Sequence, residues 1–360
     1  LALAPPLVAM QFPEILESKL HLVIDLFDPI VWENLELYVG DGEKERIFQH
    51  ERHLAALLAA MMRGDYFLVA GDRQLDLMTG ALMVLNRINP STWIQGSGPE
   101  QIVGKVPFGV PDEPPPSPEN VKLPSAYECD GPLIVWGGGM WDWLNPELVV
   151  ESLPELIKSH PKAVLAFPGT VHPNPHVPEM ASVKRVKKLA KELGVSANIR
   201  FGEWLERDEY LGLLVHADCG VSAHIPGLEA RYAARTRFLD AVWVGLPMVV
   251  TEGDEYAEYI ADHSLGEVVR EFDPVPFARA LRRTIDSGRK NLQDRITGVR
   301  RNLSWKRLAQ PLIKWAENPR LTHGHGAEFF QSTLGVTSPQ NRPSDFLSLL
   351  RRIKSKLGAD

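Results

Sequence analysis

The stretch Gly227–Thr251, GLEARYAARTRFLDAVWVGLPMVVT, constrains the fold more than any other part of the chain. Its first residues are polar and indicate a loop, and the apolar spacing that follows predicts a helix from about Ala234 to Val244. Gly245 suits a left-handed cap at the end of that helix, and Pro247 cannot continue it. The apolar run Met248–Thr251 then predicts a short strand buried on both faces, as in a parallel sheet.

Five charged side chains surround the predicted start of this helix: Glu229, Arg231, Arg235, Arg237 and Asp240. A helix N-terminus favours anions because its first amides are unpaired and the helix dipole is positive there. Arginines add paired donors that fit a phosphate, and a carboxylate one turn into the helix can accept two sugar hydroxyls. The spacing also allows a plainer alternative, in which Arg237 and Asp240 form only an ion pair within the helix.

Strands and helices alternate along the rest of the chain, which predicts an α/β fold with parallel sheets. The predicted strands are His21–Leu26, Tyr66–Ala70, Ile102–Val106, Pro132–Gly139, Ala163–Phe167, Asn198–Gly202, Cys219–Ala223 and Leu265–Val269. The predicted helices are Gly42–Arg63, Asp76–Arg87, Pro146–Ser159, Glu179–Leu193, Arg207–His216 and Val275–Ser287. The second series forms a doubly wound half, in which ligands bind at the carboxyl ends of the strands.

Prolines after Val106 rule out regular structure and indicate a linker. We therefore expect a first lobe over 1–110, a proline-rich linker over 111–131, a second lobe over 132–290, and C-terminal helices with a tail over 291–360. The chain opens with LALAPPLVAMQFPE, which has no Met and no basic leader. We expect that upstream residues are missing and that the first lobe is partial.

The run LDAVWVGLPMVVT resembles the nucleotide-sugar site of GT-B glycosyltransferases of the group 1, family 4, retaining type. The W-G-G-G and W-x-W-L-x-P runs around residues 136–146 are similar to a bacterial subgroup that makes surface polysaccharides. The resemblance implies two Rossmann-like lobes with a cleft between them, and makes Asp240 the ribose-binding acid. The family spaces its two acids eight positions apart, whereas Glu229 stands eleven before Asp240. Glu229 would therefore take the catalytic role of the first acid across a short insertion.

Gly137, Gly138 and Gly139 follow a predicted strand, where glycines let the backbone approach a phosphate or sugar closely; the alternative is a plain tight turn. Most relatives carry an Arg and a Lys after this turn, but here the text is MWDWLNP. We therefore expect Arg231 and Arg235 to neutralise the diphosphate, with Arg237 paired to Asp240 or another acid.

Several further residues are candidates for the donor site. Asp142 lies between Trp141 and Trp143, whose rings either stack on a sugar or pack in the core. Glu203 to Leu205 follow a strand where the family holds the base. His224, Gly253 and Asp254 follow two other strands. His172 and His176 have near-metal spacing without a carboxylate or Cys close by, which disfavours a metal.

The net charge of −7 gives no support for a nucleic-acid partner. Two cysteines are too few for a disulfide framework. We expect a cytoplasmic enzyme that moves a sugar from a nucleoside diphosphate sugar to a sugar or lipid-linked acceptor, without metal or cofactor. The basic, amphipathic tail Asp345–Leu357 either contacts the inner membrane face or packs on the protein. Alternatives are a GT-B-fold sugar-nucleotide epimerase and a non-catalytic nucleotide-sugar-binding module.

Overall fold

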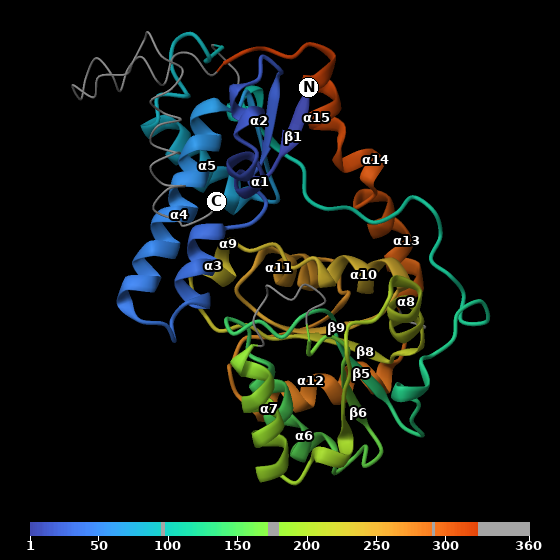
Figure 1. Cartoon of the computed structure of the whole chain (residues 1–360). Coiled ribbons are helices and arrows are strands. Elements are labelled where there is room, and N and C mark those ends of the chain that lie inside the picture. Colours follow the sequence, from blue (N-terminus) through green and yellow to red (C-terminus); the bar gives the residue numbers. More distant parts are fainter. Residues whose placement is uncertain (95–97, 172–179, 290–291, 323–360) are drawn as a thin grey trace. The chain divides into compact units, whose positions relative to one another are not determined.

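The computed structural model describes residues 1–94, 98–171, 180–289 and 292–322. The chain divides into two compact units, coloured along the sequence in Figure 1. The first unit combines Leu1–Pro107 with the part of the chain from Leu308 onward. The second unit is continuous from Phe108 to Arg307, so it includes the predicted linker. Each unit contains one parallel sheet, which confirms the predicted α/β class.

The first unit is built on a four-stranded parallel sheet in the order β1-β2-β3-β4. Its strands are β1 (Ala2–Ala4), β2 (Leu22–Asp25), β3 (Tyr66–Val69) and β4 (Val103–Lys105). Its N-terminal part also contains α1 (Pro6–Gln11), α2 (Pro13–Glu17), α3 (Ile30–Leu37), α4 (Glu43–Arg63), α5 (Asp72–Val84) and the short η1 (Pro99–Gln101). The sequence did not predict β1, because three residues of Ala and Leu carry no strand periodicity.

Both faces of this sheet are covered. One face packs against α4 and α5 through an apolar cluster around Phe67. The other face presents Val23, Tyr66 and Leu68 to α15 (Gln310–Glu317). The Trp315 ring stacks on Tyr66, with ring centroids 4.8 Å apart. A helix from beyond residue 307 therefore completes the core of the first unit.

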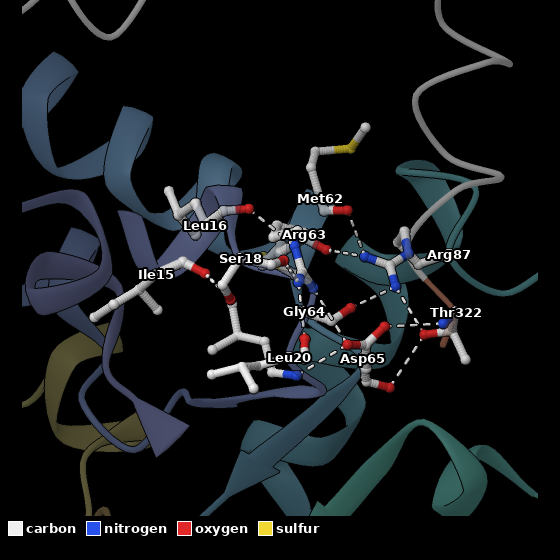
Figure 2. A network of polar contacts seen from close by, with 12 residues as sticks. Ile15, Leu16, Ser18, Leu20, Met62, Arg63, Gly64, Asp65, Arg87 and Thr322 are labelled. Atoms are coloured by element: carbon white, nitrogen blue, oxygen red, sulfur yellow. Dashed lines mark hydrogen bonds and ion pairs between the residues drawn. The ribbon is translucent and has the colours of Figure 1, made fainter. Parts of the chain in front are cut away.

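A buried polar network ties the chain after α15 to the same unit (Figure 2). Arg87 is fully buried and donates to three backbone carbonyls of the segment 61–64 and to Thr322 Oγ1. The Thr322 amide donates to Asp65 Oδ1 at 2.9 Å, and its hydroxyl donates to the Asp65 carbonyl at 3.1 Å. Asp65 Oδ2 accepts from the Leu22 amide and from Arg63. Each buried charge thus has close partners, which limits its desolvation cost.

The second unit is built on a six-stranded parallel sheet in the order β10-β9-β8-β5-β6-β7. Its strands are β5 (Leu133–Trp136), β6 (Val164–Phe167), β7 (Ile199–Phe201), β8 (Cys219–Ser222), β9 (Met248–Thr251) and β10 (Gly266–Val269). All six strands lie within the ranges that the sequence predicted. Because β5 lies between β8 and β6, the winding of the chain reverses beside it.

The helices of the second unit follow the predicted alternation, with additions near the central segment. They are η2 (Ser125–Tyr127), α6 (Pro146–Leu156), α7 (Ala181–Glu192), η3 (Ser196–Asn198), α8 (Arg207–His216), α9 (Leu228–Tyr232), α10 (Arg237–Val244), α11 (Glu255–Asp262), α12 (Pro274–Ser287), α13 (Gln293–Asn302) and α14 (Trp305–Leu308). In Figure 1, α6 lies beside α12, and α10 packs against α8 and α13.

The central segment differs from its prediction at the start and agrees at the end. Residues predicted as loop form α9, and α10 begins at Arg237 rather than near Ala234. Gly245 ends α10 with φ 74° and ψ 34°, the predicted left-handed cap. The strand β9 has the predicted bounds.

The proline-rich segment contacts α10 and α8 of its own unit. Trp243 Nε1 donates to the Glu113 carbonyl at 3.0 Å, and His216 Nε2 lies 2.9 Å from the Val121 carbonyl. Between Val110 and Leu133, a range that the structure describes throughout, the chain forms no α-helix or strand, and its one regular element is the short 3-10 helix η2 at Ser125–Tyr127. None of the helices in the described ranges combines the length and the apolar character that crossing a bilayer requires.

Candidate functional site

The candidate site lies at the carboxyl ends of β5, β8 and β9, inside the second unit. The turn Gly137–Gly139 follows β5, His224 follows β8, and Asp254 follows β9. These strands are neighbours in the sheet, so the three loops leave the same edge beside the reversal of the winding. Parallel α/β sheets bind ligands at that place, because the loops on either side of the reversal diverge there.

The Gly137–Gly139 turn requires glycine at its first two positions for different reasons. A Cβ on Gly137 would stand 2.9 Å from Tyr210 Oη and 3.4 Å from Arg237 Cβ. Gly138 has φ +86°, a region that residues with a Cβ rarely adopt. Trp136 Nε1 donates to the Gly139 carbonyl at 3.2 Å and fixes the end of the turn.

Arg237 is the arginine that lies against this turn. Its guanidinium carbon lies 5.1 Å from the centroid of the Trp136 ring, and Nη2 is 3.5 Å from the Gly139 carbonyl. Its Nη1 is buried and has no hydrogen-bond partner among the residues that the structure describes. Burial and the neighbouring Arg235 lower the pKa of Arg237 to about 10, so it stays charged at neutral pH. The turn therefore has a cation beside it, and Nη1 of that cation can donate a hydrogen bond to a ligand.

Arg235 and Arg231 are placed differently. Arg235 is buried and forms a bidentate ion pair with Glu229, with Nη1–Oε1 at 3.1 Å and Nη2–Oε2 at 2.8 Å. Arg231 is exposed, and its guanidinium carbon lies 5.9 Å from the Tyr232 ring centroid. Of the three arginines, Arg235 is engaged with an acid and Arg231 faces solvent.

Asp254 and His224 extend this buried cluster. Asp254 Oδ2 lies 3.0 Å from His224 Nδ1 and 3.9 Å from Arg235 Nε. Its Oδ1 accepts from the Ala257 amide at 2.8 Å and caps α11. On the other side of the imidazole, His224 Nε2 is 3.2 Å from Ser222 Oγ.

Electrostatics decide the charge of this cluster. Burial and the nearby Arg235 lower the pKa of His224 to about 4, although Asp254 opposes the shift. Burial alone would raise the pKa of Asp254, but His224, Arg235 and the Ala257 amide outweigh it and hold that pKa below its usual value. At neutral pH the imidazole is therefore neutral and the Asp254 carboxyl is ionised.

Asp240 lies half-buried in the first turn of α10. Burial raises the pKa of its carboxyl, and Arg207 counteracts part of the shift. Tyr210, which the sequence did not single out, is close enough that burial and Asp240 both raise its pKa. In the described part of the chain no ion pair joins Arg237 to Asp240, so the carboxylate is not held by the arginine three positions earlier. Tyr210 directly follows three charged residues in α8, and no motif in the sequence distinguishes it.

The Asp142 carboxylate accepts hydrogen bonds from the start of α7, about forty residues further along the chain. Its two oxygens accept from the amides of Ala181 and Ser182, at 3.1 and 2.6 Å, and so hold the start of α7. The neighbouring rings of Trp141 and Trp143 stack on each other, with centroids 5.1 Å apart and planes at 8°. Asp142 thus lies beside the glycine turn with its carboxylate directed at a helix start.

The remaining candidates lie further along the edge. Glu203 is exposed and Leu205 partly exposed, just after β7 at the end of the sheet. Gly253 precedes Asp254 with φ +130°. His172 and His176 lie outside the described residues. Within the described ranges, no three His, Cys, Asp or Glu side chains stand together in a way that could hold a metal ion.

Comparison with known proteins bears on this arrangement. Residues 142–301 match the family model of group 1 glycosyl transferases. The fold is similar to that of a UDP-forming α,α-trehalose-phosphate synthase from Burkholderia xenovorans, with a TM-score of 0.58 and 14% identity over 85% of this chain and 69% of that one.

The fold is GT-B.

Two further solved structures are similar to this chain. Sucrose-phosphate synthase from Thermosynechococcus elongatus has a TM-score of 0.54 and 15% identity, over 88% of this chain and 73% of that one. HepE from Anabaena, solved with UDP and glucose, has a TM-score of 0.56 and 12% identity, over 88% and 77%. No curated protein matches the sequence. At such identities the structural likeness carries the fold alone, whereas the family match covers α6 to α13 and every charged candidate in the central segment.

Proposed function

We propose that this protein is a glycosyltransferase, which moves a sugar from a nucleoside diphosphate sugar to an acceptor hydroxyl. The observation that carries the proposal is Arg237, whose buried Nη1 has no hydrogen-bond partner in the described part of the chain and lies beside the Gly137–Gly139 turn. A diphosphate at that turn would supply the missing acceptor. The UDP of the Anabaena structure is a ligand of this chemical class.

The roles that we propose follow from the contacts. Arg237 neutralises the leaving diphosphate, together with backbone amides of the glycine turn. We assign this role to Arg237 rather than to Arg235, because both terminal nitrogens of Arg235 are on Glu229. Glu229, which Arg235 holds by both oxygens, is the carboxylate that we propose acts on the donor sugar. Asp240 accepts the ribose hydroxyls, as the resemblance implies.

Retention at the anomeric carbon and independence of metal are parts of the same proposal. Both rest on the resemblance of the central segment and on the cationic groups that would carry the leaving charge. Transfer should continue in EDTA. Activity that is lost in EDTA and restored by Mg²⁺ or Mn²⁺ would contradict a metal-free reaction.

The acceptor that we propose is a sugar, free or lipid-linked, of the kind used in surface polysaccharide synthesis. This rests on the resemblance of the W-G-G-G and W-x-W-L-x-P runs, and of the central segment, to the bacterial subgroup. The tail Asp345–Leu357, for which the sequence allows either contact with the inner membrane face or packing on the protein, lies outside the described residues. Vesicle co-sedimentation with and without residues 323–360 would test that contact.

The experiment that tests the proposed function is a thermal-shift panel of UDP, GDP, ADP, CDP and dTDP sugars. A ligand that binds only the folded state raises the melting temperature by mass action. The stabilising donor is then assayed for release of its nucleoside diphosphate. Asp240→Asn should weaken binding of that nucleotide by about 1–3 kcal/mol and leave the melting temperature of the free protein unchanged. The proposal fails if no donor stabilises the protein, or if the bound donor is isomerised without any transfer.

A further inference from the structure

Arg235 stands between two buried acids. Its terminal nitrogens hold both oxygens of Glu229, and its Nε lies 3.9 Å from Asp254 Oδ2. All three side chains are nearly inaccessible to solvent, at 9%, 4% and 3% exposure. A guanidinium is planar and rigid, so a displacement at Nε also turns the fork that holds Glu229.

Asp254 is itself held from three directions. His224 Nδ1 lies 3.0 Å from Oδ2, the Ala257 amide donates to Oδ1, and Arg235 approaches from the side of Glu229. These partners come from β8, α11 and the segment before α10, which are fixed by the sheet and by the helix cap. Asp254 is therefore held by groups from three different parts of the chain.

The charges of the cluster balance when His224 is neutral. Glu229 and Asp254 contribute two negative charges, and Arg235 with the neighbouring Arg237 contributes two positive charges. Removing the Asp254 charge leaves Arg235 with one acid and an Nε that faces a neutral group. In a low dielectric, a charge that loses its partner is strongly disfavoured, so Arg235 would shift towards the nearest remaining acceptor.

We propose that Asp254 is a positioning residue. It interacts with Arg235 on the Nε side of the guanidinium, opposite the nitrogens that bind Glu229, and so fixes the direction of the Glu229 carboxylate at the carboxyl edge of the sheet. Only the predicted effect of Asp254 on turnover rests on the proposed function. The arrangement itself, a chain from His224 through Asp254 and Arg235 to Glu229, is tested without any donor.

The variant Asp254→Asn isolates the charge. Asparagine caps a helix about as well as aspartate, so the α11 cap is kept while the charge that faces Arg235 is lost. The matched control is Asp273→Asn, since Asp273 caps α12 through the Val275 amide and is exposed. With the donor that the wild type turns over in a panel of UDP-glucose, GDP-mannose and ADP-glucose, we expect Asp254→Asn to lower kcat by about 10²-fold. Its KM should stay within about twofold of the wild type, as binding groups are untouched, and Asp273→Asn should keep wild-type turnover.

A double-mutant cycle separates positioning from a purely structural role. If Asp254 acts through Arg235 on Glu229, then Asp254→Asn should cause no further loss of kcat once Glu229→Gln is present. Additive losses, or wild-type turnover in Asp254→Asn, would overturn the inference. If Asp254→Asn melts below the assay temperature, Arg235→Lys replaces it in the cycle with Glu229→Gln, because Arg235→Lys leaves the α11 cap and His224 in place.

The second readout needs no donor. Urea unfolding of the same four proteins should show that Asp254→Asn and Glu229→Gln couple, with the double variant more stable than the sum of the single losses predicts. Absence of that coupling would overturn the chain of contacts. If the wild type turns over none of these three donors and no CDP or dTDP sugar either, but the coupling is present, the proposed function fails and the positioning contact stands.

Discussion

Arg237 decides how the proposed site handles the charge of its leaving group. Arg237→Ala removes the cation that lies beside the glycine turn, and should lower kcat by about 10²-fold, as loss of a group that stabilises developing charge does. Arg231→Ala is the control, since Arg231 is exposed on the preceding helix. Turnover and melting temperature are measured together. A large loss in Arg231→Ala with normal turnover in Arg237→Ala would reverse the assignment.

His224 should make the stability of the protein depend on pH. Burial and Arg235 lower its pKa to about 4, against about 6.5 in the unfolded chain, so the unfolded state binds the proton first as pH falls. The stabilisation is complete above pH 6.5 and is lost between pH 6.5 and 4. The free energy of unfolding should therefore drop by about 2 kcal/mol between pH 7 and pH 5 through this residue.

Urea unfolding at the two pH values measures this loss. His224→Gln should reduce the drop, because glutamine does not titrate. The control is His216→Gln at an exposed histidine of α8, which should leave the drop as it is in the wild type. An equal drop in all three proteins would show that His224 is not the titrating group.

At the scale of elements, Gly245 tests the end of α10. Its φ of 74° and ψ of 34° put it in the left-handed region, where a Cβ meets the following carbonyl. Gly245→Ala should lower the free energy of unfolding by about 1–2 kcal/mol. Gly80→Ala is the opposite control, because Gly80 lies inside α5 with open space around its Cβ, and alanine there should stabilise by about 0.4–1 kcal/mol. Equal effects of the two substitutions in urea unfolding would contradict the cap.

Sequence reasoning predicted the strands of the second unit well, because buried parallel strands are short apolar runs between glycines and polar turns. It located the end of α10 for the same local reason, Gly245 followed by Pro247. It did not predict α9 or α11, which have only five and eight residues and are stabilised by where they pack.

For the site residues too, the sequence predicted what is local and missed what depends on packing. Sequence proximity brought the central arginines and acids into one segment, but it gave no information on which arginine faces which partner. Glu229 and Arg235 are six positions apart and meet because α9 turns back before α10 begins. The contact between His224 and Asp254 joins the ends of two neighbouring strands, which only the strand order of the sheet determines.

At the scale of the whole molecule, the first unit depends on a residue far along the chain. Thr322→Val removes the hydroxyl that accepts from Arg87 and donates to the Asp65 carbonyl, and leaves two buried groups each short of a partner. The free energy of unfolding should fall by about 1–3 kcal/mol. Thr79→Val is the matched control, because Thr79 Oγ1 is buried in the same unit without a hydrogen-bond partner among the described residues, so valine should be neutral there. A loss in Thr79→Val as large as in Thr322→Val would contradict the role of the network.

The second unit is inserted within the sequence of the first, and this order determines when each unit can form during synthesis. Asp65 and Thr322 are 257 positions apart. A ribosome adding about 5–20 residues per second needs roughly 13–50 s to make that stretch. During that interval the Tyr66 face of the first sheet and the buried charges of Asp65 and Arg87 have no covering helix. The second unit is continuous in sequence and has no such delay. The N-terminal part of the nascent chain must therefore wait, with apolar surface available to chaperones, until translation has passed the end of the unit that follows it.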